Sequence, residues 1–382
     1  MRRALAAIAV VALAGALARR RDPDSPAHTA LVHGSLTVAA VPFLASEAAR
    51  RRDARLFWEL LALQQLRAGV ALAHHHLTAT LYEHSTDVDE YHAAGQRIAE
   101  SLRAGRLSEV AELMRTFPWD TRLRWPVSTN LMRLLNGGVY AAVGPSRRTS
   151  MVAYSWLGFC GLCFFERAFS IGVPHGRRRA YLAALAHPSL TFWTSGIGKE
   201  PWMTFGFGTL ALGAAKTMTG SARTGLPLMG LGTAAAGAMR IQVGGRLGMT
   251  LGSELRTAGD RSYIGGSRFT PPRADSIRDA PRVAASVLFR PLPGEAHNRP
   301  ALVAAADAML LLLLTLARAR WIAAAVASAP RRPYVAFAAA STAVVVAYLA
   351  RVANFGMLVR QRTPVLPFYL VLLSVPPRGR RA

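Results

Sequence analysis

The stretch "ALVAAADAMLLLLLTLAR", residues 301–318, is apolar along almost its whole length. About 20 such residues in a helix are enough to cross the hydrocarbon core of a bilayer. Comparable stretches recur from one end of the chain to the other, several of them short or interrupted: 4–18, 28–46, 56–82, 149–169, 180–196, 201–218, 225–245, 333–351 and 363–376. The pattern predicts an all-α, polytopic transmembrane helical bundle of about 8–11 spans.

The composition supports a membrane protein. Of the 382 residues, 52% are hydrophobic, and the mean hydropathy is +0.22. The formal net charge of +25 comes mainly from arginines in short clusters between the apolar stretches. There is neither a continuous basic face nor a nucleic-acid-binding motif, so the expected partners are membrane lipids with anionic headgroups and no nucleic acid. The two cysteines, Cys160 and Cys163, lie in an apolar segment and are expected to pack there, not to form a redox pair.

Four regions follow from the pattern. Residues 1–55 form an N-terminal anchor or spans of open topology, with a retained span favoured over a cleaved signal peptide. Residues 56–249 form the membrane core, with an acidic extracytoplasmic loop at 83–127. Residues 250–300, rich in Gly, Pro, Arg and Asp, form a loop that caps the membrane face, and residues 301–382 supply C-terminal transmembrane helices with a short basic tail.

The arginine clusters also predict which segments share a side of the membrane. If they are cytoplasmic, as the positive-inside rule prefers, counting spans places 84–95, 194–201, 250–300 and 360–362 together on the other side. The first 50 residues do not fit this scheme, because arginines flank a single predicted span at both ends. We expect a multi-pass protein of the cell membrane whose active face is extracytoplasmic.

The acidic segment "TDVDEYH", residues 86–92, follows a predicted span and contains Asp87, Asp89, Glu90 and His92. Carboxylates at a membrane surface can act as a general base, or can hold a divalent cation such as Mg²⁺ or Mn²⁺ that neutralises a phosphate leaving group. Alternatively, the segment caps and begins the next helix. Both interpretations stay open, because one does not exclude the other.

The corner "TSGIGKEPWM", residues 194–203, separates two apolar stretches. Gly196 and Gly198 allow a tight backbone, so one helix is expected to end near residue 195 and another to begin near Pro201. Lys199 and Glu200 then stand at a helix N-terminus facing water, where Lys199 can meet an anion. A membrane anchor at headgroup level is the alternative.

Further arginines are candidates for contacts with a phosphate group. Arg360 and Arg362 precede a final span that is interrupted by prolines, and the span count places them on the extracytoplasmic side, although arginines usually lie on the cytoplasmic side. They are therefore candidates for a guanidinium clamp on phosphate or for interfacial anchors. Arg240 lies within or at the end of a predicted span, where an arginine faces a cavity or a partner. The loop "FRPLPGEAHN", residues 289–298, adds Arg290 and Glu295, either as a groove lining or as packing groups.

Three segments resemble a known group of proteins: "FERAFSIGVPHGRRRAYLAALAHPSLTFWTSGIGKEPWM", "LFRPLPGEAHN" and "NFGMLVRQRTPVLPF". The chain is similar in patches, over most of residues 80–373, to bacterial polytopic membrane proteins related to the C-superfold (GT-C-like) glycosyltransferases and exopolysaccharide polymerases. The resemblance implies a polyprenyl-phosphate-linked sugar donor and an acidic motif in the first large extracytoplasmic loop. That motif falls on Asp89 and Glu90, with Asp87 as a neighbour, and lipid-phosphate contacts fall on Arg360 and Arg362, with Lys199 in addition.

The sequence therefore predicts an integral membrane glycosyltransferase-like protein of cell-envelope or exopolysaccharide synthesis. One alternative is a transporter or flippase component for lipid-linked glycan, in which the same charges bind cargo without reacting. Another is a noncatalytic membrane assembly subunit. Many transporters contain internal repeats, and none is visible here, which favours the enzyme. The oligomeric state is left open.

Overall fold

The structure is a computed structural model. It describes residues 22–81, 87–116, 126–239, 267–272 and 276–377. Within these residues the chain is helical and contains no β-strand, in agreement with the predicted all-α class. The chain divides into two compact units. Unit 1 comprises residues 1–160, 194–202 and 238–241, and unit 2 comprises residues 161–193, 203–237 and 242–382.

Unit 1 contains the N-terminal helices and the corner at 194–202. Its helices are α2 (Pro26–Arg51), α3 (Ala54–Leu81), α4 (Asp87–Arg103), α5 (Leu107–Thr116), α6 (Pro126–Val143) and the first half of α7 (Arg147–Gly172). Local chemistry fixes the first of these: Ser25 accepts a hydrogen bond from the backbone N–H of His28, Pro26 occupies the first turn, and Arg52 ends the helix with a positive φ of 52°.

Unit 2 contains the rest of α7 and all but the ends of α10 and α11. Its elements are α8 (Arg178–Ala184), α9 (Pro188–Trp193), α10 (Lys199–Met218), α11 (Ala222–Met239), η2 (Ile277–Asp279), α13 (Ala280–Phe289), η3 (Pro293–Glu295), α14 (Arg299–Ala317), α15 (Ala319–Ser328), η4 (Ala329–Arg331), α16 (Pro333–Leu349), α17 (Phe355–Arg362), η5 (Thr363–Val365) and α18 (Leu366–Leu372). Asparagine caps begin two of them: Asn298 accepts from the amide of Ala301, and Asn354 from that of Met357.

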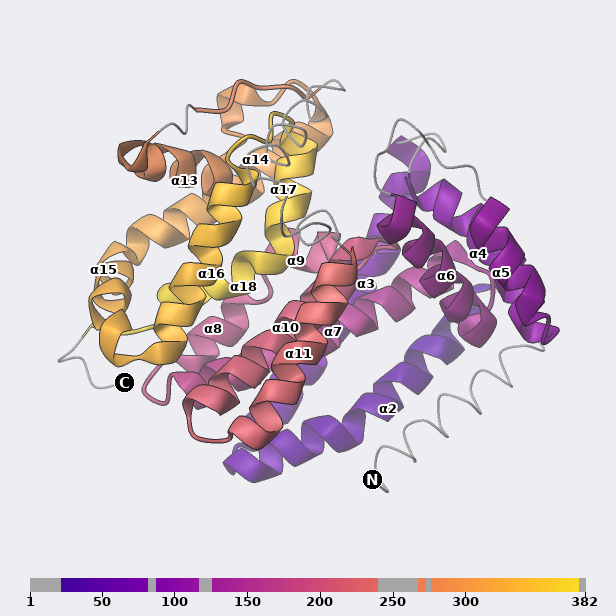
Figure 1. Cartoon of the computed structure of the whole chain (residues 1–382), viewed down its shortest axis with the longest axis horizontal. Coiled ribbons are helices and arrows are strands. Elements are labelled where there is room, and N and C mark those ends of the chain that lie inside the picture. Colours follow the sequence, from indigo (N-terminus) through magenta and orange to yellow (C-terminus); the bar gives the residue numbers. More distant parts are fainter. Residues whose placement is uncertain (1–21, 82–86, 117–125, 240–266, 273–275, 378–382) are drawn as a thin grey trace. The chain divides into compact units, whose positions relative to one another are not determined.

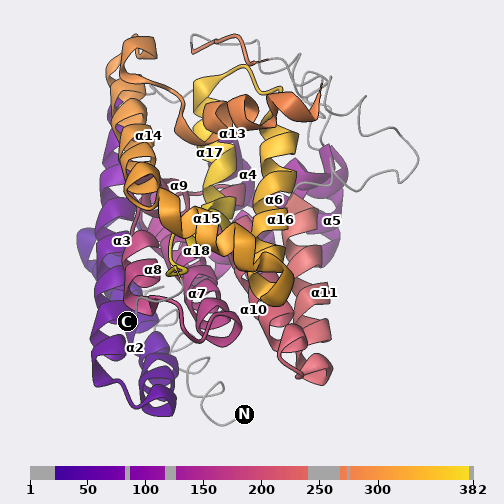
Figure 2. The same ribbon diagram turned by 90° about the vertical axis from the view of Figure 1, so that its left-hand side faces the viewer.

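Glycines bring three helices of unit 2 into backbone contact. Gly208 of α10 lies against the backbone of Gly161 in α7, so closely that a Cβ at Gly208 would overlap the Gly161 carbonyl oxygen. On another side of α10, Gly206 faces Gly232 of α11, and these two helices lie side by side in both views (Figures 1 and 2). Small residues at close helix contacts are typical of membrane proteins, where packing holds helices together without a hydrophobic driving force.

Two described helices, α2 and α14, are long and apolar enough to cross a membrane. A third candidate is the pair formed by residues 319–331 and 333–349, if a bend of 118° is accepted within one span. Membrane-spanning helices are thus supported, while the larger number of about 8–11 stays a prediction. The predicted span 180–196 is wrong as one helix: α8 ends at Ala184 and α9 begins at Pro188, because proline cannot continue a helix from its interior.

Candidate functional site

The acidic segment forms the first turn of α4, which packs closely on α6 (Figure 1). Gly95 allows this approach, since a Cβ there would lie 2.6 Å from the side-chain nitrogen of Asn136. Asn136 is buried and donates to the backbone oxygen of Tyr91 over 2.8 Å. The two helices are therefore held in a fixed register, and the first turn of α4 is positioned by α6.

Each of the two predicted carboxylates in this turn meets an arginine. Asp89 lies 2.6 Å from a terminal nitrogen of Arg147, at the start of α7. Glu90 pairs with Arg133 of α6, whose side chain is 6% exposed while that of Glu90 is 40% exposed. An arginine within an apolar helix is costly unless it is paired, so these contacts stabilise both partners. Asp87 is the first residue of α4, and its side chain lies outside the described part of the structure.

His92 lies one turn beyond Asp89. Its Nδ1 is 2.6 Å from the hydroxyl of Tyr140 on α6. Burial lowers the pKa of His92, and the positive charge of Arg147 lowers it further, against smaller opposing effects of Asp24 and Asp89. The ring is therefore neutral at pH 7, and could accept or share a proton but adds no positive charge for an anion.

The corner at 194–200 breaks the helix as predicted, since α9 ends at Trp193 and α10 begins at Lys199. It differs from the prediction in its exposure: Glu200 is 4% exposed and Lys199 is half-buried, so the corner is packed inside unit 1 and does not face open water. Lys199 donates to the hydroxyl of Ser128 over 2.9 Å. The corner is shielded because the neighbouring helix α3 packs on it, with His74 against Gly196.

Arg67 of α3 anchors this corner. Its guanidinium is fully buried and donates to the backbone oxygen of Thr194 over 2.7 Å and to that of Ser155 over 3.2 Å. Gly158 leaves room for the guanidinium, because a Cβ at this position would overlap it. An arginine that satisfies backbone carbonyls in this way fixes the chain just before Lys199.

Helix α6 links the acidic segment to the lysine corner within unit 1. Ser128 near its start contacts Lys199, and Arg133 further along contacts Glu90. Asp89, Glu90, His92, Lys199 and Glu200, predicted from segments more than a hundred residues apart, thus belong to one compact unit. The sequence did not single out Arg67, Ser128 or Arg147 for this role. The one available signal was an arginine inside an apolar helix, because such a side chain needs a partner.

The loop residues Arg290 and Glu295 belong to unit 2 and bind one another. Arg290 also stacks over the ring of Phe269, 4.4 Å from its centre. Burial raises the pKa of Glu295, but hydrogen bonds from Arg290 and from the amide of Leu292 lower it, and the net pKa is below the ordinary value. These contacts make the pair a brace for the loop, as in the packing alternative.

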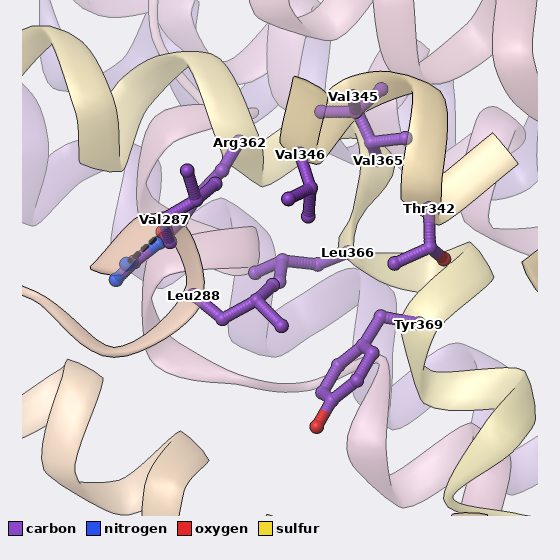
Figure 3. A pocket seen from close by; sticks show the side chains of 9 residues that line it. All are labelled: Val287, Leu288, Thr342, Val345, Val346, Arg362, Val365, Leu366 and Tyr369. Carbon is purple, nitrogen blue, oxygen red and sulfur yellow. Dashed lines mark hydrogen bonds between the residues drawn. The ribbon is translucent and has the colours of Figure 1, made fainter. Parts of the chain in front are cut away.

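Arg362 lies deep inside unit 2. It is 2% exposed and donates to the backbone oxygens of Val287 and Arg290, both over 2.9 Å. It borders a cavity of about 10 Å³, about the room needed for one water molecule, whose lining is otherwise mainly aliphatic (Figure 3). Arg360, two residues earlier, is half-buried. A phosphate clamp made by Arg360 and Arg362 stays a prediction, as does the placement of these arginines on the same side of the membrane as the acidic segment.

Two further predictions have no structural outcome. Arg240 lies outside the described residues. Among the described residues, no group of three or more His, Cys, Asp or Glu side chains is placed to hold a metal ion. Comparison of the chain with known protein families, curated proteins and solved structures finds no match.

Proposed function

We propose that the chain is an integral membrane glycosyltransferase-like protein that transfers sugar from a polyprenyl-phosphate-linked donor during cell-envelope or exopolysaccharide synthesis. The observation that carries the proposal is the joining of the acidic turn and the lysine corner by α6 in unit 1. Carboxylates and a cationic group are the two kinds of side chain that this transfer requires.

In the proposed reaction, a carboxylate of the acidic turn takes the proton from an acceptor hydroxyl. The acceptor oxygen bonds to the anomeric carbon of the sugar as the bond from that carbon to the phosphate oxygen breaks. Asp89 and Glu90 are suited to the first role, because a carboxylate can accept a proton and their arginine partners hold both side chains in place. Lys199 is suited to stabilise the negative charge on the departing polyprenyl phosphate.

The apolar surface of unit 2 supports the placement of this protein in a membrane. Helix α14 exposes one apolar side, made of Leu302, Val303, Leu310, Leu313 and Leu316. Contiguous exposed side chains of this kind are unfavourable in water and favourable against lipid acyl chains. The face of the membrane on which the acidic turn lies is proposed to be extracytoplasmic, from the arginine distribution alone.

The proposal is tested by reconstituting the full chain into vesicles with a radiolabelled polyprenyl-phosphate sugar and a crude membrane acceptor. We expect the wild-type protein to transfer label, and Asp89→Asn to lower the rate by about 10²–10⁴, the usual contribution of a general base. Glu109→Gln is the matched control: this acid lies on α5 of the same unit, pairs with Arg106 and is outside the acidic turn. Unchanged turnover in Asp89→Asn removes Asp89 as the base, and absence of transfer by wild type overturns the proposed function.

Sidedness is tested separately with a membrane-impermeant thiol reagent, in a background in which Cys160 and Cys163 are replaced by serine. Val88→Cys, next to the predicted base, is expected to react from outside the cell. His175→Cys, an exposed position beside the arginine cluster at 177–179, is expected to react only after the membrane is opened. Labelling of both positions from one side contradicts the extracytoplasmic placement.

A further inference from the structure

A buried polar cluster in unit 2 contains His187, Ser189, Asp307 and Arg362. Asp307 lies near the middle of α14, one of the two apolar helices long enough to cross a membrane. Its Oδ1 accepts from the backbone amide of Ser189 over 2.8 Å and lies 3.1 Å from Nδ1 of His187. Its Oδ2 is 3.9 Å from Nη2 of Arg362. An ionisable group at such a depth is costly to bury and is commonly functional in membrane proteins.

The contact with Asp307 fixes the tautomer of His187. Oδ1 of Asp307 already accepts a hydrogen bond from the amide of Ser189, so the imidazole nitrogen that faces this oxygen must carry the hydrogen. Nδ1 of His187 is therefore the donor, and Nε2 carries a bare lone pair. His187 is 6% exposed, and its Nε2 has no hydrogen-bond partner among the described residues.

This arrangement is not that of a nucleophilic triad. In a Ser–His–Asp triad the serine and the carboxylate contact opposite nitrogens of the imidazole. Here the hydroxyl of Ser189 lies 3.3 Å from Nδ1, the same nitrogen that faces Asp307. The free basic position of the ring therefore points away from both, and an activated serine does not follow from this geometry.

We propose that Nε2 of His187 is a proton-binding site in the buried interior of unit 2, oriented by Asp307. Three facts support it: the fixed tautomer, the unpartnered and buried lone pair, and a carboxylate placed to stabilise the imidazolium. The proton comes from a hydronium ion of the solvent: its O–H bond breaks to leave water as an N–H bond forms at Nε2, and no bond breaks in the protein. The charge of the cluster rises by one.

The surrounding charges set the pH at which the site fills. Burial lowers the pKa of His187, Asp307 on α14 raises it, and Arg362 on α17 lowers it, with a net pKa below the ordinary 6.5. His187 itself lies in the turn between α8 and α9, outside the candidate spans. The site therefore binds its proton at a lower pH than an ordinary imidazole does. It is independent of the proposed sugar transfer, which concerns residues of unit 1.

The site is tested by nitrogen-15 NMR of the full-length protein in detergent, labelled at its ten histidines. Signals missing from His187→Gln are assigned to His187. At neutral pH we expect hydrogen on Nδ1 and a bare Nε2, and in acid hydrogen on both. An internal control is His28, whose Nε2 lies 2.6 Å from the carbonyl oxygen of Val143. Because a carbonyl oxygen only accepts, His28 must carry its hydrogen on Nε2, whereas His187 carries it on Nδ1.

Two variants separate this proposal from a merely structural role. Asp307→Asn keeps the shape of the side chain but removes its charge, so the titration midpoint of His187 should fall and the preference for hydrogen on Nδ1 should weaken. Glu166→Gln, a change at another buried acid of unit 2, should leave the His187 signals in place. If His187→Gln does not fold, Ser189→Ala gives the assignment by shifting only the Nδ1 signal of His187. A hydrogen found on Nε2 at neutral pH, or no titration before acid unfolding, overturns the proposal.

Discussion

Replacement of Arg67 by methionine is expected to loosen the lysine corner of unit 1. Methionine keeps most of the apolar stem but removes the donors that reach the backbone oxygens of Thr194 and Ser155. Hydrogen bonds from charged groups contribute about 1.5–3 kcal/mol each, so two carbonyl partners correspond to about 3–6 kcal/mol. Methionine also removes the cost of burying a charge, which offsets part of the lost hydrogen-bond energy. The expected net decrease in the free energy of unfolding is about 2–4 kcal/mol.

The corresponding change in melting temperature follows from the size of the protein. An unfolding entropy of about 2.1 cal/mol/K per residue gives about 0.8 kcal/mol/K for 382 residues. The expected decrease in Tm is therefore about 2.5–5 °C. Cys163 is buried in α7 and becomes reactive on unfolding, so a thiol-reactive fluorescent dye follows the transition in detergent.

Arg55→Met is the matched control, because Arg55 lies on the same helix and its side chain is exposed. Surface substitutions of this kind usually change stability by less than about 0.5 kcal/mol. Equal melting temperatures for Arg67→Met and Arg55→Met would refute the argument that the buried guanidinium anchors the corner.

Two further predictions concern helix packing and pH. Gly208→Ala should lower Tm strongly, because its Cβ would overlap the backbone of Gly161. Gly230→Ala, at a position in open space on α11, should leave Tm unchanged or slightly higher. Similar Tm values for the two variants would contradict the close contact between α10 and α7. The pKa of His92 in the folded protein is below its ordinary 6.5, so its contribution to stability is present above that pH and is lost as the pH falls through the folded pKa. Wild type should therefore lose more stability on acidification than His92→Gln, in melting curves recorded across the range; parallel curves would count against a buried neutral ring beside Tyr140.

Much of the local structure could be predicted from the sequence, because periodicity and proline are local signals. The helical class and the break before Lys199 both follow from neighbouring residues. The break between α8 and α9 was not predicted, because the apolar stretch 180–196 is long and Pro188 is a single interruption in it. The sequence also marked the acidic turn and the lysine corner as carriers of chemistry, on residue type alone.

The partners of those residues were decided by tertiary structure. Nothing local in the sequence pairs Glu90 with Arg133, and nothing assigns Arg67 to the carbonyl of Thr194, which is 127 positions away. Burial of Arg362 and the meeting of His187 with Asp307 likewise depend on helix packing. Sequence patterns report which side chains are polar and which faces are apolar, but a charged side chain acquires its pKa, its partner and its exposure only when distant helices exclude water around it.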